Sequence, residues 1–133
     1  MKSKLLAVIV ILTIVLSVWG TLPAMAAPTA NCNSATQWRS VATGNWNDNT
    51  IWQCNTGTWV TPNNSQFPNG ATLDITLQSP YVVTLNANVT ALNLTIDAGG
   101  TLTFGAFTLT LANGSVVTVN GTMNLGTTGV LRT

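Results

Sequence analysis

The sequence predicts an all-β fold, a β-solenoid that follows an N-terminal cap. Three observations lead to this prediction. Apolar and polar residues alternate almost without interruption from Leu73 onward, and the segment is rich in Val, Thr, Leu and Ile, the residue types that suit a pleated surface. A twelve-residue pattern recurs four times in it. No segment after residue 27 has a helical period of useful length.

The recurring pattern consists of two alternating apolar residues, a turn of about four residues, and alternation again. The four units span residues 74–85, 93–104, 108–119 and 122–133, with starts 19, 15 and 14 residues apart. Repeats of this kind bury their apolar faces against one another. If equivalent positions stack, two buried rows result. The predicted rows are Ile96, Leu111 and Leu125, and Leu102, Val117 and Leu131.

An antiparallel β-meander or sandwich is the alternative fold. Asn120-Gly121 lies between two alternating runs and suggests a two-residue hairpin. That hairpin would place Val119 opposite Thr122 and send apolar side chains to opposite faces. A three-residue loop, with Val119 opposite Met123, removes the conflict and keeps a meander open. Recurrence of the turn glycines at matching places favours the solenoid.

The first 26 residues have the layout of a secretory signal peptide. Lys2 and Lys4 precede an apolar run at Leu5–Trp19, and Ala24-Met25-Ala26 matches a cleavage site. The run is shorter than the about 20 apolar residues that span a bilayer. We therefore expect cleavage after Ala26, a secreted or cell-surface location, and no stable membrane span in the exported chain.

Charged residues are scarce in the exported part. It contains two arginines and three aspartates, giving a net charge of −1, and no Lys, Glu or His. Two arginines cannot form the basic face that nucleic-acid binding requires. Nucleic acid is thereby excluded as a partner.

Cys32 and Cys54 are the only cysteines. A pair of cysteines in an oxidising compartment indicates a disulfide. Two thiols without a nearby histidine fall short of the usual four zinc ligands. We expect a disulfide and neither a metal nor a cofactor.

Residues 27–72 are predicted to form the cap. They contain both cysteines and four tryptophans, and Thr56–Thr72 is rich in Pro, Asn and Gly, which indicates turns. The tryptophans have two interpretations. They form the core of the cap, or Trp46, Trp52 and Trp59 stack on sugar rings while Asp48 binds hydroxyl groups. Asp48 and its neighbouring asparagines are interpreted as Asx turns rather than as a calcium site.

Enzymatic activity is the least favoured function. Glycoside hydrolysis needs two carboxyl groups about 5–10 Å apart. The acids are Asp48, Asp74 and Asp97, and the last two occupy different positions in the repeat. With no His, Glu or Lys, acid–base catalysis has few candidates, so we assign no catalytic residues.

The far end of a solenoid exposes unpaired backbone groups. The sequence stops at Thr133, where the fourth unit ends. We expect either further coils in the natural protein or end-to-end stacking of this end on another structure.

Several segments resemble known secreted proteins. They are Thr43–Asp48 (TGNWND), Ile51-Trp52, Pro68–Ala71 (PNGA), Asp74–Leu77 (DITL) and the coil-like Leu94–Phe104. In this order they look like the opening of bacterial cell-surface proteins built on a right-handed parallel β-helix, including autotransporter-like adhesins. The resemblance covers about residues 38–133 and implies that fold.

A weaker resemblance is to the G8 domain, a glycine-rich extracellular β module. It rests on scattered positions that include Trp52, Pro68, Gly70, Gly100 and Met123–Thr127. Both resemblances imply an extracellular β-rich module. The leading prediction is therefore an exported structural or adhesive module without catalytic activity, with extracellular glycans or cell-surface components as partners. A carbohydrate-binding module is the alternative, and the N-terminal part of a polysaccharide-active enzyme is less favoured.

Overall fold

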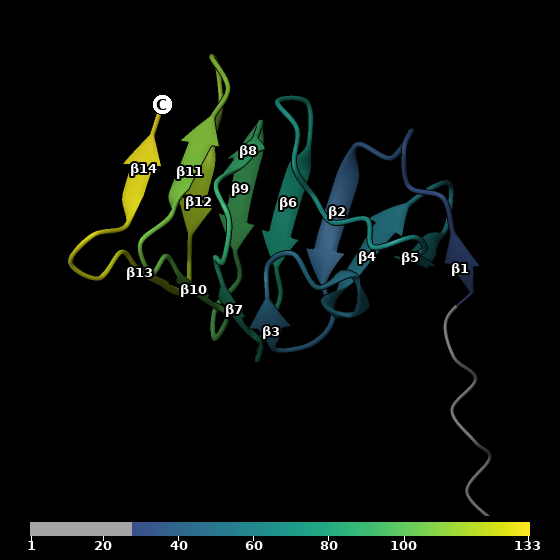
Figure 1. Cartoon of the computed structure of the whole chain (residues 1–133), viewed down its shortest axis with the longest axis horizontal. Coiled ribbons are helices and arrows are strands. Elements are labelled where there is room, and N and C mark those ends of the chain that lie inside the picture. The colour runs from purple at the N-terminus through teal and green to yellow at the C-terminus, as the bar shows by residue number, and fades with distance from the viewer. Residues whose placement is uncertain (1–27) are drawn as a thin grey trace, which may run out of the picture.

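The computed structural model describes residues 28–133 and shows an all-β protein (Figure 1). The predicted signal peptide lies outside the described residues. One short 3₁₀ helix, η1 (Asn49–Ile51), interrupts the strands. The first five strands are β1 (Thr29–Ala30), β2 (Gln37–Ser40), β3 (Gly44–Asn45), β4 (Trp52–Asn55) and β5 (Trp59–Pro62). The stretch Thr56–Thr72, in which the sequence indicates turns, also contains β5.

The remaining strands are three or four residues long. They are β6 (Asp74–Leu77), β7 (Val82–Thr84), β8 (Val89–Ala91), β9 (Asn93–Ile96), β10 (Thr101–Thr103), β11 (Thr108–Leu111), β12 (Val117–Val119), β13 (Thr122–Asn124) and β14 (Val130–Arg132). They belong to three sheets. The sheet orders are β1-β5-β4-β2-β6-β9-β12, β13-β10-β7-β3 and β14-β11-β8.

From β6 onward, successive strands enter the three sheets in turn, and every described pair is parallel. Each strand therefore pairs with the strand three further along the chain. Leu77 lies beside Ile96, and Ile96 beside Val119. The antiparallel meander considered as an alternative is wrong for this part of the chain.

The predicted stacking rows are wrong. Ile96 pairs with Leu77 and Val119, whereas Leu111 pairs with Ala91. The reason is that the chain enters all three sheets once in every three strands, which we call one circuit. Each predicted unit contains only two strands. Only the first two units, residues 74–85 and 93–104, lie in register with each other.

The third strand of the first circuit is β8, which lies in the segment between the first two predicted units. Val89 and Ala91 alternate there with an outward Thr90, and both are buried. Side-chain hydrogen bonds link three of the strand pairs. The residues that these bonds join are 19, 20 or 23 positions apart in the sequence. The additional residues lie in the turns, so the strands keep parallel register.

Inward side chains of the three sheets form one apolar core. The largest fully buried side chains after residue 73 are Phe104, Ile75, Leu77, Leu85, Leu94, Ile96, Leu102, Leu109 and Val83. Strands β6 and β9 alternate strictly between half-buried and buried positions, as the sequence pattern predicts.

The Asn120-Gly121 pair forms a corner between sheets and not a hairpin. The backbone N–H groups of Asn120 and Gly121 both donate to the Ile96 carbonyl, at 2.8 and 3.1 Å. A Cβ atom at Gly121 would lie 2.3 Å from the Gly100 carbonyl oxygen. This close approach of two chain segments requires glycine.

The N-terminal part extends the largest sheet. β4 pairs antiparallel with both β2 and β5, and β2 pairs in parallel with β6. Strand β3 pairs with β7 at the edge of the second sheet. As a result, the strands follow one another along the long axis of the molecule, with β1 at one end and β14 at the other (Figure 1).

Candidate functional site

Trp46 and Trp52 belong to the core. Both indoles are 0% exposed, and their rings meet edge to face with centroids 4.9 Å apart. Trp46 Nε1 donates to the Pro68 carbonyl at 2.8 Å, and Trp52 Nε1 donates to the Trp46 carbonyl at 2.7 Å. The prediction that these two residues stack on sugars is corrected, because neither ring has a face free for a ligand. The interpretation as a cap core holds for both.

Trp59 is the one predicted carbohydrate-binding tryptophan that is half-exposed. The Arg39 guanidinium carbon lies 4.3 Å from its ring centroid. Arg39 is held there by Gln53, whose Oε1 accepts from Nε and Nη2 at 3.0 and 2.7 Å. A cation thus occupies one face of Trp59.

Asp48 caps the 3₁₀ helix. Its Oδ1 accepts from the Thr50 backbone N–H at 2.9 Å and from the Thr50 hydroxyl at 2.6 Å. Both hydrogen bonds hold the pKa of the exposed Asp48 carboxyl below its usual value, and the bond from the Thr50 side chain has the larger effect. This is the predicted Asx turn. It gives the Asp48 carboxylate a structural partner, Thr50.

The predicted disulfide between Cys32 and Cys54 is present. It joins the loop before β2 to the middle of β4, with 6.0 Å between the Cα atoms. Both cysteines are buried. The bond ties the N-terminal segment to the sheet.

Asp74 and Asp97 lie at opposite ends of neighbouring strands. Asp74 begins β6 and pairs with Asn93, whose Nδ2 donates to the carboxylate at 2.7 Å. Asp97 follows the last residue of β9, four residues beyond Asn93. At about 3.3 Å per residue this is roughly 13 Å along the strand, more than paired catalytic carboxylates allow.

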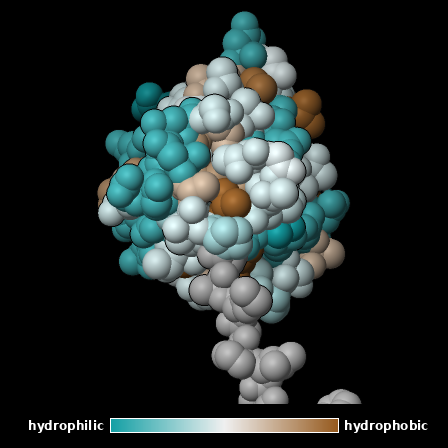
Figure 2. Space-filling model, turned by 90° about the vertical axis from the view of Figure 1, so that its right-hand side faces the viewer, coloured by the Kyte–Doolittle hydropathy of each residue, from teal (hydrophilic) through white to brown (hydrophobic). Residues whose placement is uncertain are grey.

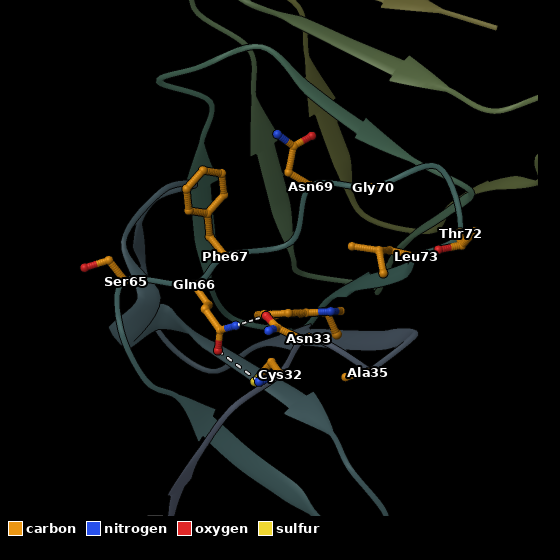
Figure 3. A pocket seen from close by; sticks show the side chains of 11 residues that line it. Cys32, Asn33, Ala35, Ser65, Gln66, Phe67, Asn69, Gly70, Thr72 and Leu73 are labelled. Atoms are coloured by element: carbon orange, nitrogen blue, oxygen red, sulfur yellow. Dashed lines mark hydrogen bonds between the residues drawn. The ribbon is translucent and has the colours of Figure 1, made fainter.

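A hollow of about 420 Å³ opens beside the disulfide. Its walls come from the segment that runs from Cys32 to Trp38 and from the loop that runs from Ser65 to Leu73 (Figure 3). In Figure 3, Gln66 bridges from the loop to Cys32 and Asn33, while Phe67 and Asn69 lie on the other side. None of the lining residues within 28–133 carries a charge. Polar amide groups and apolar side chains therefore share a neutral concavity.

This hollow was not predicted from the sequence. Its lining includes Trp38 on a short strand and residues of the Pro/Asn/Gly-rich stretch. The only feature of the sequence that indicated such a hollow was a long loop together with a tryptophan. The sequence alone does not show that the loop folds back over residues 32–38.

A second distinctive surface lies at the β12–β14 end. Large exposed apolar side chains within residues 28–133 are concentrated there: Val116, Val117, Val119, Leu125 and Val130, with Val82 apart from them. The opposite end differs. Figure 2 views the molecule from the β1 side and shows a mostly hydrophilic to intermediate surface with scattered hydrophobic residues.

Among residues 28–133, no three His, Cys, Asp or Glu side chains are placed to hold a metal ion. The same residues contain no helix with the length and apolarity needed to cross a membrane. Comparison with protein-family models, curated proteins and solved structures finds no match to this chain.

Proposed function

We propose that this protein is a structural or adhesive module of an exported bacterial protein, built as a right-handed parallel β-helix. From β6 onward, successive strands enter the three sheets in turn and pair in parallel, which supports the solenoid. Right-handed connections between parallel strands are almost universal. The resemblance of residues 38–133 to secreted β-helix proteins supports the same class of protein.

One observation carries the proposed role. Apolar positions that are buried in the earlier strands continue into the last circuit, β12–β14, and become exposed there. Leu94 is 0% exposed and its neighbour Val117 is 37% exposed; Ile96 is 0% exposed and its neighbour Val119 is 45% exposed. Among the strands of residues 28–133, β12, β13 and β14 each have a neighbour on one side only. Apolar rows beside three unpaired strand edges form a surface for further β-structure.

The occupant that we propose is a second copy of this chain. The same end of each copy would meet in an isologous contact, which buries the exposed valines and pairs the free edges. The scarcity of charge after residue 27 leaves few side chains to oppose this contact. Further coils in a longer natural chain would cover the same surface.

We expect the purified chain to self-associate and Val119→Lys to weaken the association at least about tenfold, because an edge lysine blocks strand addition. Sedimentation velocity over a concentration series measures this. Val82→Lys is the matched control: Val82 is 39% exposed, but its strand β7 has neighbours on both sides. A wild-type mass that stays monomeric at all concentrations, or equal effects of the two variants, would contradict the proposed contact.

Export is proposed from the first 26 residues and agrees with the disulfide. When the chain is expressed in a bacterial host, we expect the protein outside the cytoplasm to begin at Ala27. Intact-mass spectrometry of that fraction measures the cleavage site. Ala26→Leu should block cleavage, since small residues are required there. Recovery of only the uncleaved chain, in the cytoplasm, would overturn the proposal of export.

A further inference from the structure

Three Asn-Gly pairs occur in the chain: Asn69-Gly70, Asn113-Gly114 and Asn120-Gly121. A glycine that follows asparagine has no side chain to shield its backbone nitrogen, so such a pair readily loses the side-chain amide as ammonia. The reaction requires the glycine nitrogen to leave its hydrogen bond and approach the asparagine side chain. The local structure therefore decides which of the pairs reacts in the folded protein.

Two of the pairs are held by neighbouring strands. The Gly70 N–H donates to the Thr90 carbonyl at 2.8 Å, and Asn69 Oδ1 accepts from the Thr90 N–H, also at 2.8 Å. The Gly121 N–H donates to the Ile96 carbonyl at 3.1 Å, and a Cβ atom at this glycine would collide with backbone oxygens. In both pairs the attacking nitrogen is bound to an acceptor and must first be released.

The Asn113-Gly114 pair lies in the exposed turn between β11 and β12, which projects from the body of the molecule (Figure 1). The Ser115 N–H donates to the Ala112 carbonyl at 3.2 Å, and Gly114 has a φ of 80°. Asn113 and Gly114 are thus the two central residues of a β-turn, with glycine where a positive φ is needed. A Cβ atom at Gly114 would meet nothing within 4 Å.

The reacting groups of this pair are not bound to the protein. Within residues 28–133, the Gly114 N–H donates to no acceptor and the Asn113 side chain makes no hydrogen bond. Both residues are exposed, so water reaches them directly. The nitrogen and the carbon that it attacks can therefore meet without the loss of any contact.

We propose that Asn113 is a site of spontaneous deamidation in the folded protein. The Gly114 backbone nitrogen attacks Asn113 Cγ. The new N–C bond closes a succinimide ring as the Cγ–Nδ2 bond breaks, and the proton of the Gly114 amide leaves with the ammonia. Water then opens the ring at either carbonyl carbon, which restores the Gly114 N–H and gives aspartate or isoaspartate. Asparagine and water become an acid and ammonia, without an oxidant, a reductant or an enzyme.

The conversion changes both the charge and the backbone of the turn. Either product adds a negative charge to a part of the chain that has only two arginines and three aspartates, and isoaspartate also adds a methylene group to the main chain. Val116, the residue before β12, is held separately, because its N–H donates to Asn93 Oδ1 at 2.7 Å. We expect β12 to keep its pairing with β9. The inference does not rest on the proposed self-association.

The test follows all three asparagines in the purified, oxidised chain during incubation at neutral and mildly alkaline pH. Peptide mapping by tandem mass spectrometry measures the acid formed at each position and separates aspartate from isoaspartate. We expect Asn113 to react at least about tenfold faster than Asn69 and Asn120, because the other two glycine amides must first be released. The rate should rise with pH, since base removes the amide proton. Equal rates at the three positions, or no acid at Asn113, overturn the proposal.

Unfolding and a matched pair of variants provide the controls. In guanidinium chloride with a reductant, the three rates should converge, because each pair then lacks its fold. A preference for Asn113 that persists in the unfolded chain would contradict the structural argument. Asn113→Gln should remove the acidic form that isoelectric focusing detects, since the longer side chain closes its ring slowly, whereas Asn120→Gln should keep it. An undiminished acidic form in Asn113→Gln would show that the site lies elsewhere.

Discussion

Replacing Trp46 with alanine is expected to lower the free energy of unfolding by about 3–5 kcal/mol. The indole is completely buried against Trp52, and its Nε1 donates to the Pro68 carbonyl at 2.8 Å. Alanine would leave a cavity and a carbonyl oxygen without its donor. Domains are stable by only about 5–15 kcal/mol. This one substitution would remove a large share of the stability.

Urea denaturation followed by far-ultraviolet circular dichroism measures the effect. Trp59→Ala is the matched control, because Trp59 is half-exposed and its contact with the Arg39 cation contributes about 0.5–1 kcal/mol. Trp46→Phe should fall between the two, since it keeps an aromatic ring and loses the bond to Pro68. Equal losses for Trp46→Ala and Trp59→Ala would show that the buried pair is not central to the core.

Removal of the disulfide has the second large expected effect, a loss of about 3 kcal/mol in the free energy of unfolding. The bond joins residues 22 apart in sequence, so it restricts the unfolded chain considerably. In the folded state it anchors the segment that follows β1. Strand β1 has only two residues, and its one neighbour among the described strands is β5.

The measurement compares the thermal midpoint of the chain with and without a reductant. The wild type should become less stable on reduction. The double variant Cys32→Ala/Cys54→Ala should start near the reduced value and show no response to the reductant. A reduced wild type as stable as the oxidised protein would show that the strand pairing alone holds this segment.

Local properties of the fold could be predicted from the sequence. Apart from β8, alternation identified the strands after Leu73, and two glycines at predicted turns, Gly99 and Gly114, have positive φ angles of 88° and 80°. The pairing of Cys32 with Cys54 followed from there being only two cysteines. The strands and turns depend on a few neighbouring residues, and the pairing of the two cysteines had no alternative.

The pairing of strands could not be predicted in the same way. Alternation reports which side chains point inward, but it does not distinguish one sheet from another. The residues Leu109 and Leu111 in β11 therefore looked equivalent to Leu94 and Ile96 in β9, although the two strands belong to different sheets. The short β8, Val89–Ala91, gave too brief a signal to be counted as a third strand.

The prediction that Trp46 and Trp52 contact sugars was wrong for a related reason. A tryptophan beside asparagines suits both a sugar platform and a small core, and composition does not decide between them. Burial excludes Trp46 and Trp52 from a sugar platform, while the hollow around Trp38 depends on a loop about thirty residues further along the chain. Such long-range contacts are set by the whole fold.

The separation of paired strands by about twenty residues has a consequence for how the chain acquires its structure. Asp74 finds its partner Asn93 after 19 residues, a short loop to close. We expect each completed strand to serve as a template for the one three further on, so that order spreads by nearest-neighbour addition. Damage at β14 removes a single interface, whereas damage at β6 separates the two halves of the largest sheet. Among the strands from β6 onward, we therefore expect more tolerance to change at β14 than at β6.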